Sequence, residues 1–223
     1  MENLKEFYKK AIDCNHCFEN LDIERGIVKA SQPRWIGENY FQAEKRICIL
    51  MINPGDVGPK DEYSQIKSSN EFQSLIEGFK DDIVSWEDLM FFILRDMPNW
   101  GVGGKYMKLY FDHLGLALKD SAFLNIMLCS AKKLDRNGQM KNFYNQQTMQ
   151  NCFELHTLSM LTELNPHVCI LSGTTVWEFA SRSNLRSLFP KCKFEELNHY
   201  AARGHHWYRA IDKAKIISND LQS

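Results

Sequence analysis

The chain has 223 residues, a formal net charge of −1, and a composition that is 44% hydrophobic and 25% charged. A chain of this length and composition can bury a large globular core and needs no disulfide bonds for stability. The near-zero net charge excludes a uniformly basic surface, so a nucleic-acid partner would have to bind a local basic patch.

The chain shows no pattern for export or membrane insertion. Residues 1–6 lack the basic segment and apolar run of a signal peptide. No stretch approaches the ~18 consecutive apolar residues of a membrane span. We therefore expect a cytoplasmic protein that enters no membrane. In that reducing compartment, the seven cysteines favour metal binding or burial over disulfide bonds.

Short apolar runs alternate with amphipathic segments along the chain. Helices are predicted at residues 1–13, within 60–98, and at 105–116, 146–164, 174–186 and 207–217. Buried strands are predicted at residues 47–52, 122–129 and 167–173, with a fourth strand at 193–197. A polar, basic loop is expected after the second strand. The alternation predicts an α/β fold whose parallel sheet is covered by helices on both faces.

Four cysteines are placed as metal ligands would be. Cys14 and Cys17 form a C-x-x-C pair after the first helix, Cys129 ends the second apolar run, and Cys152 lies in the next helix. Thiolates spaced in this way can share one soft metal centre, and spacing alone does not separate zinc from an iron–sulfur cluster. We expect the other three to be buried core thiols, since cysteine is often buried: Cys48, Cys169 and Cys192.

A set of short segments forms a family pattern: residues 14–17, 52–55, 98–103, 124–129, 152, 170–173 and 198–203. In this order they resemble the iron–sulfur branch of the uracil-DNA glycosylases over nearly the whole chain, although no single segment is specific. The resemblance implies one domain over residues 1–223, with three α/β/α layers and a central four-stranded parallel sheet. It also implies that the four cysteines hold a structural [4Fe–4S] cluster, with zinc as the alternative.

The chain departs from that family at several places. Met51 stands where the family has glycine, and residues 52–55 are closer to the mismatch-specific and single-strand-selective branches. Residues 199–201 read His-Tyr-Ala where the family has His-Pro-Ser, and residues 56–97 form a mainly helical insertion. These departures predict a divergent branch whose base need not be uracil.

Excision of a base breaks an N-glycosidic bond, so the leaving base gains negative charge while water attacks the sugar. The resemblance implies that Asn53 and His199 are catalytic. Asn53 would position the attacking water, and His199 would donate a hydrogen bond to the base oxygen. Taken alone, Asn53 also fits an ordinary Asn-Pro-Gly turn, and His199 fits a surface-loop histidine.

The expected base-binding residues are Asn125, Trp100, Ile52 and Gly55. Asn125 lies within an apolar strand, where its amide is costly unless it is hydrogen bonded either to the backbone or to a base edge. Trp100 could stack on the flipped base or belong to the core. The resemblance favours the base-binding role for each of them.

The expected DNA-binding residues are basic side chains beside two of the strand ends. Lys132 and Lys133 follow the second apolar run, and Arg203 and His205 follow the last strand. They could bind phosphates, although isolated charges are more often part of a solvated surface.

We hypothesise that the chain is a monomeric, monofunctional DNA glycosylase without a lysine Schiff base. It would flip uracil or a modified pyrimidine, such as an enlarged cytosine, and leave an abasic site. Its role would be base-excision repair or defence against phage with modified DNA. One alternative is a non-catalytic iron–sulfur or zinc nucleic-acid-binding module on the same fold, and another is a small-molecule enzyme on the same kind of sheet.

Overall fold

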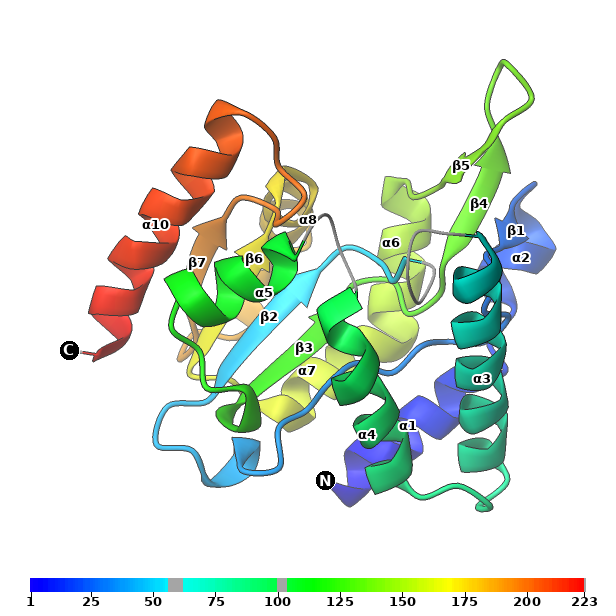
Figure 1. Cartoon of the computed structure of the whole chain (residues 1–223), viewed down its shortest axis with the longest axis horizontal. Coiled ribbons are helices and arrows are strands. Elements are labelled where there is room, and N and C mark those ends of the chain that lie inside the picture. Colours follow the sequence, from blue (N-terminus) through cyan, green and yellow to red (C-terminus); the bar gives the residue numbers. More distant parts are fainter. Residues whose placement is uncertain (56–61, 100–103, 223) are drawn as a thin grey trace. The chain divides into compact units, whose positions relative to one another are not determined.

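A computed structural model describes residues 1–55, 62–99 and 104–222, which form two compact units. Unit 1 consists of Met1–Arg34, Asn53–Asp96 and Asn125–Glu163, and unit 2 of Trp35–Ile52, Met97–Leu124 and Leu164–Ser223. Each unit is therefore built from three separate segments of the chain, which can be followed by colour in Figure 1. The single domain expected over residues 1–223 stays a prediction.

Unit 2 is built around a four-stranded sheet with the order β3-β2-β6-β7. Its strands are β2 (Ile47–Met51), β3 (Ser121–Asn125, whose last residue is counted with unit 1), β6 (Val168–Ser172) and β7 (Lys193–Leu197). β6 pairs in parallel with β2 and β7, and β2 and β3 point the same way in Figure 1. Every residue of β3 and β6 is buried, because strands covered on both faces require continuous apolar runs. The expected α/β fold with a four-stranded parallel sheet is confirmed.

Helices flank this sheet. α8 packs against β6, and α10 packs against both β7 and the π-helical segment η3. The helical elements of unit 2 are η1 (Tyr40–Gln42), η2 (Met97–Asn99), α5 (Lys105–Met107), η3 (Lys108–His113), η4 (Leu118–Asp120), α8 (Thr174–Arg182), α9 (Leu185–Leu188) and α10 (His205–Gln222). The last helix is longer than the predicted residues 207–217.

Unit 1 is mainly helical. Its helical elements are α1 (Glu2–Ile12), α2 (His16–Asn20), α3 (Glu62–Lys80), α4 (Trp86–Asp96), α6 (Gln146–Cys152), η5 (Phe153–Thr157) and α7 (Leu158–Leu164), whose last residue is counted with unit 2. α1 buries Leu4, Tyr8 and Ile12 on one face. α3 packs against α4, where the rings of Phe72 and Phe92 stack with their centroids 4.9 Å apart. The described part of residues 56–97 is thus helical, as expected.

Unit 1 also contains a small antiparallel sheet of β1 (Glu24–Arg25), β4 (Ala131–Leu134) and β5 (Met140–Asn142), in the order β1-β4-β5. The expectation of a loop after the second strand was wrong here, because residues 131–142 form a β-hairpin. The Asp135 amide donates to Gln139 O at 2.8 Å, and Gly138 adopts a left-handed φ of 73° that closes the turn.

Candidate active site and metal centre

The four predicted ligand cysteines line one pocket within unit 1. Cys14 follows α1, Cys17 lies in α2, Cys129 follows β3, and Cys152 is the last residue of α6. The other lining residues are mainly apolar: Phe18, Ser31, Met127, Leu155 and His156. The fold therefore brings together four thiols whose positions span almost 140 residues of the sequence.

Hydrogen-bond donors surround two of these sulfurs. Arg25 Nη1 donates to Cys129 Sγ at 3.1 Å, Ser31 Oγ lies 3.2 Å from the same sulfur, and the Leu128 amide donates to Cys152 Sγ at 3.3 Å. Donors of this kind stabilise thiolates and tune a metal bound to them. Burial raises the pKa of the Cys17, Cys129 and Cys152 thiols. The thiols therefore need a cation to become thiolates near neutral pH.

The pocket between the thiols is small. Its cavity volume is about 20 Å³, and no group of three or more His, Cys, Asp or Glu side chains in the described ranges is arranged to hold a metal ion as it stands. The four sulfurs would have to turn toward a common centre to coordinate an inorganic group. The donor set itself fits soft-metal chemistry, because it consists of thiols without a neighbouring carboxylate in the lining.

Asn125 is the last residue of β3, and its side chain is fully buried. Neither Oδ1 nor Nδ2 has a hydrogen-bond partner, whereas the backbone oxygen accepts from Thr157 Oγ1 at 3.1 Å. An amide buried in this way costs about 1–3 kcal/mol of folding free energy. A protein that keeps such a group usually has a functional partner or an ordered water for it.

Asn53 lies two residues after the end of β2 and is half-buried. Its Nδ2 donates to Pro54 O at 3.2 Å, which fixes the amide and leaves Oδ1 as the acceptor that can face a water molecule. Ile52 is half-buried and Gly55 is exposed in the same loop. Trp100 lies outside the described residues.

His199 lies two residues after the end of β7 and is half-buried. The Ala201 amide donates to its Nδ1 at 3.2 Å. A ring nitrogen that accepts a hydrogen bond carries no proton, so the neutral imidazole has its proton on Nε2. Burial lowers the pKa of His199 to about 4. The ring is therefore neutral near pH 7 and presents Nε2–H as a donor.

The loop that carries His199 is held from several sides within unit 2. Gly173 has a φ of 101°, and a Cβ added to it would lie 3.2 Å from the His199 Cβ. Tyr200 packs edge-on against Tyr106 at a centroid distance of 5.0 Å, and Lys105 Nζ donates to Ala202 O at 3.1 Å. Sequence reasoning missed these supports, since their only signal was the glycine at the end of the third apolar run.

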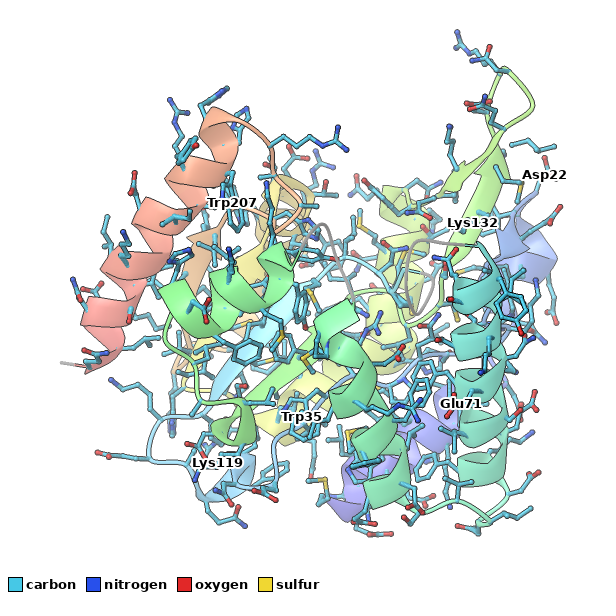
Figure 2. The ribbon with its side chains drawn as sticks, in the orientation of Figure 1. Asp22, Trp35, Glu71, Lys119, Lys132 and Trp207 are labelled. Atoms are coloured by element: carbon cyan, nitrogen blue, oxygen red, sulfur yellow. The ribbon has the colours of Figure 1, made fainter. Side chains whose placement is uncertain are left out.

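The predicted DNA-binding residues lie on different elements. Lys132 and Lys133 are in β4 of unit 1, whereas Arg203 and His205 lie in unit 2, in the loop before α10 and at its first residue. Both unit 2 residues are exposed. Lys132 Nζ donates to Asn142 Oδ1 at 2.7 Å within the hairpin (Lys132 is labelled in Figure 2).

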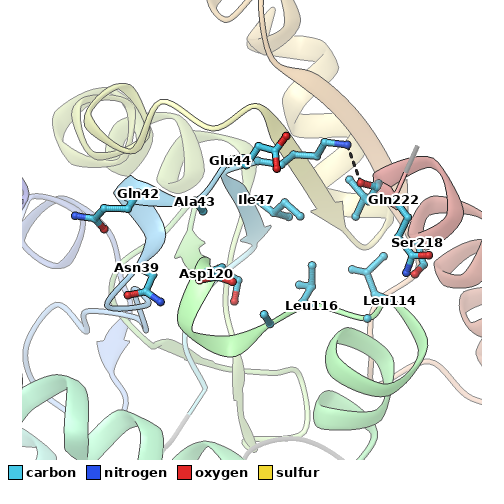
Figure 3. Close-up of a pocket in the computed structure, with 15 residues that line it drawn as sticks. Asn39, Gln42, Ala43, Glu44, Ile47, Leu114, Leu116, Asp120, Ser218 and Gln222 are labelled. Carbon is cyan, nitrogen blue, oxygen red and sulfur yellow. Dashed lines mark hydrogen bonds between the residues drawn. The ribbon is translucent and has the colours of Figure 1, made fainter.

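Asn53, Asn125 and His199 lie at or just after the carboxyl ends of three strands, where ligands bind in open α/β sheets. Asn53 and Asn125 belong to unit 1 and His199 to unit 2, so their convergence stays a prediction. A separate pocket of about 430 Å³ in unit 2 lies beside the first residues of β2 and β3 (Figure 3). Its lining includes Ile47, Ser121 and Ser218, and none of the predicted site residues.

A prediction about protonation follows from the His199 environment. Its pKa is lowered from 6.5 to about 4, so the folded ring stays neutral while the unfolded chain gains a proton below pH 6.5. Stability from this group is fully present above pH 6.5 and falls by up to about 3 kcal/mol as the pH drops toward 4. NMR titration of the ring, assigned with His199→Gln, should give a midpoint near 4. A midpoint near 6.5 would contradict the burial of the ring.

Comparisons with known proteins give similarity to solved structures alone. No model of a known protein family matches the chain, and no curated protein matches it. Among solved structures, the chain is similar to the crystal structure of wild-type SMUG2 from Pedobacter heparinus, with 18% sequence identity and a TM-score of 0.49. The similarity covers 80% of this chain and 76% of that one. A similarity this distant establishes neither a family nor an activity.

No helix among the described residues is long and apolar enough to cross a bilayer.

Proposed function

We propose that the chain is a monofunctional DNA glycosylase that hydrolyses the N-glycosidic bond of uracil or a modified pyrimidine. The observation that carries this proposal is the fully buried Asn125 amide, which lacks any partner for its donor or acceptor. It lies at the carboxyl end of a parallel strand, where ligands are bound in α/β sheets. The pattern of segments that resembles the uracil-DNA glycosylases supports the same reading.

A primary amide is a good partner for the edge of a pyrimidine. For uracil, Asn125 Oδ1 would accept from N3–H while Nδ2 donates to O4; for a cytosine, a flipped amide would accept from the N4 amino group and donate to N3. Such a pair would satisfy both groups that the chain leaves unpaired. The base must leave its stack to reach a buried amide, so binding would require flipping.

The bond-breaking step would use His199 and Asn53. The base leaves with the electron pair of the glycosidic bond, and His199 Nε2–H donates a hydrogen bond to the oxygen where this charge collects. Asn53 Oδ1 orients the water whose oxygen bonds to the sugar carbon, and the water proton passes to solvent. The base then takes a proton from solvent. No lysine Schiff base takes part, so borohydride should trap no covalent complex.

We also propose that the four pocket cysteines hold a [4Fe–4S] cluster, with zinc as the alternative. A bound group of either kind would cross-link α2, the segment that follows α1, the segment after β3 and the end of α6, which is a structural task. The apolar lining and the donors to Cys129 and Cys152 suit thiolate ligation. Brown colour with iron and acid-labile sulfide supports the cluster, and a colourless protein with stoichiometric zinc supports the alternative.

The direct test is excision of a base from defined DNA. The protein is incubated with single- and double-stranded oligonucleotides that carry uracil, hypoxanthine or an enlarged cytosine, and alkali then cleaves abasic sites. We expect strand breaks with at least one pyrimidine, and a loss of at least about 100-fold in rate for His199→Ala and Asn53→Ala. The preferred base would separate a repair role from defence against phage with modified DNA.

Two outcomes would count against catalysis. Breaks that persist unchanged in both variants would point to a contaminating glycosylase. Tight DNA binding without excision of any base would favour the non-catalytic nucleic-acid-binding module.

A further inference from the structure

The hairpin formed by β4 and β5 places like charges opposite each other. In its register, Lys133 lies directly across from Lys141, and Lys132 lies across from Asn142. Like charges at opposed positions of an antiparallel pair destabilise it. Lys133 Nζ lies 3.9 Å from a carboxylate oxygen of Asp22, but the Asp22 side chain is fully exposed, so this pair contributes little. Lys141 Nζ donates to the neutral Gln139 amide at 2.7 Å.

The charge of this hairpin contrasts with the rest of the chain. Residues 131–142 carry four basic side chains and one acidic side chain, whereas the whole chain has a net charge of −1. The acidic residue is hydrogen bonded within the turn, because Asp135 Oδ1 accepts from the backbone amides of Asn137 and Gln139, both at 2.9 Å. The carboxylate therefore organises the turn that carries Arg136.

The hairpin also exposes an apolar pair. Leu134 and Met140 lie opposite each other, with 59% and 42% of their surfaces exposed. All of β5 is exposed, and the turn between β4 and β5 projects beyond the strands in Figure 1. Because side chains alternate across a strand, Leu134 and Met140 lie on the face of the hairpin opposite to that of Lys133 and Lys141. Exposed apolar side chains of this kind contact sugars and unstacked bases in DNA. A two-stranded ribbon with a lysine pair on one face and an exposed apolar pair on the other is suited to the groove of an anionic polymer with apolar faces.

We propose that the β4–β5 hairpin, residues 131–142, is a DNA-contact surface. Lys133 and Lys141 bind backbone phosphates from one face of the hairpin, and the Leu134–Met140 pair on its other face packs on sugars or bases of the groove that the ribbon enters. This inference rests on the proposed function for its choice of DNA as the partner. Phosphates between Lys133 and Lys141 would remove the repulsion that the free hairpin carries.

The test measures affinity for a uracil-containing duplex by fluorescence anisotropy over a range of salt concentrations. We expect Lys133→Gln/Lys141→Gln to weaken binding at least about 10-fold at low salt, and to reduce the slope of log affinity against log salt by about 1 per lysine. Leu134→Ser/Met140→Ser should weaken binding several-fold and leave the slope unchanged, because it removes apolar contact and no charge.

A matched control removes two lysines elsewhere. Lys119 and Lys191 are exposed and precede β3 and β7, at the amino ends of these strands. Lys119→Gln/Lys191→Gln makes the same change in net charge and should leave both affinity and slope as in the wild type. Equal losses in this control and the hairpin variant would reduce the effect to net charge and overturn the proposal. Circular dichroism confirms that each variant is folded.

Single-turnover excision at saturating enzyme separates this inference from the proposed function. Hairpin variants should reach the wild-type rate at saturation, because the hairpin binds DNA without touching the reacting bond. Excision combined with hairpin variants of unchanged affinity and slope would overturn the hairpin proposal alone. Hairpin-dependent binding without excision would overturn the glycosylase proposal alone.

Discussion

We expect Asn125→Leu to make the protein more stable and to abolish base excision. The wild-type amide is fully buried without a partner, and leucine has a similar volume without polar atoms. Removing the unpaired amide should raise the free energy of unfolding by about 1–3 kcal/mol. Losing the donor and acceptor that read the base should lower the single-turnover excision rate at least about 100-fold. Denaturant unfolding and alkali cleavage of treated DNA measure the two effects.

Gln32 provides the matched control for this prediction. Its side chain is also fully buried, and both amide atoms lack a partner, but it lies outside the strand ends. Gln32→Met should therefore give a similar gain in stability and keep the wild-type excision rate. Loss of excision in Asn125→Leu but not in Gln32→Met would distinguish an amide that reads the base from one that is only buried. If both variants excise at the wild-type rate, Asn125 does not read the base and the central argument for the function is lost.

Asn125→Asp extends this prediction to the choice of base. A carboxylate offers acceptors only, so it can pair with the N4 amino group of a cytosine but repels O4 of uracil. Activity on uracil should fall more than activity on a cytosine derivative. The ratio of the two excision rates is the measurement, and an unchanged ratio would contradict direct reading of the base edge.

Much of the sheet could be predicted because burial leaves a direct mark on the sequence. The strands β2, β3 and β6 are covered on both faces, so each appears as a run of apolar residues. β7 was predicted at its observed bounds even though only Phe194 and Leu197 of its five residues are buried. The second run was predicted to extend to residue 129, but pairing ends at Asn125 and the apolar residues beyond it are buried without belonging to the strand.

The β4–β5 hairpin could not be predicted from periodicity. Its strands are short and lysine-rich, and β5 has no buried residue. Its formation depends on a turn held by Asp135 and Gly138, and on pairing of Arg25 with Ala131 across more than 100 residues. Long-range pairing of this kind leaves no local pattern in a single sequence.

The positions of the site residues could be predicted from the sequence, but their surroundings could not. The four cysteines were singled out by spacing and type, and they line one pocket. The environment of His199 was not accessible, because its lowered pKa comes from burial, and its proton position from the Ala201 amide. Gly173 approaches the ring from another strand end, and only the fold brings these residues together.

The cysteine pocket carries the second large effect, because a metal that binds only the folded chain stabilises it. Cys17→Ser should lose the bound metal and lower the free energy of unfolding by at least about 3 kcal/mol, which corresponds to about 10 °C in Tm. Chelation of the wild-type protein should give a similar loss. Metal content per chain and thermal unfolding are the measurements, and Cys192→Ser, outside the pocket, should change neither.

Substitutions of Arg25 test whether this residue orients the cysteine sulfurs for metal binding. Its guanidinium donates to Cys129 Sγ at 3.1 Å, to Cys14 O at 2.6 Å and to Asn15 Oδ1 at 2.8 Å. It therefore links the segment that carries Cys14 to the segment that carries Cys129. Lysine cannot make this fork of bonds. Arg25→Lys and Arg25→Met should therefore both lower metal affinity, by about 10- to 100-fold as for other residues that orient ligands. Arg25 variants that keep full metal affinity, while Cys17→Ser loses it, would show that the fork does not position the ligands. A Cys17→Ser protein with unchanged metal content and Tm would remove the metal centre altogether.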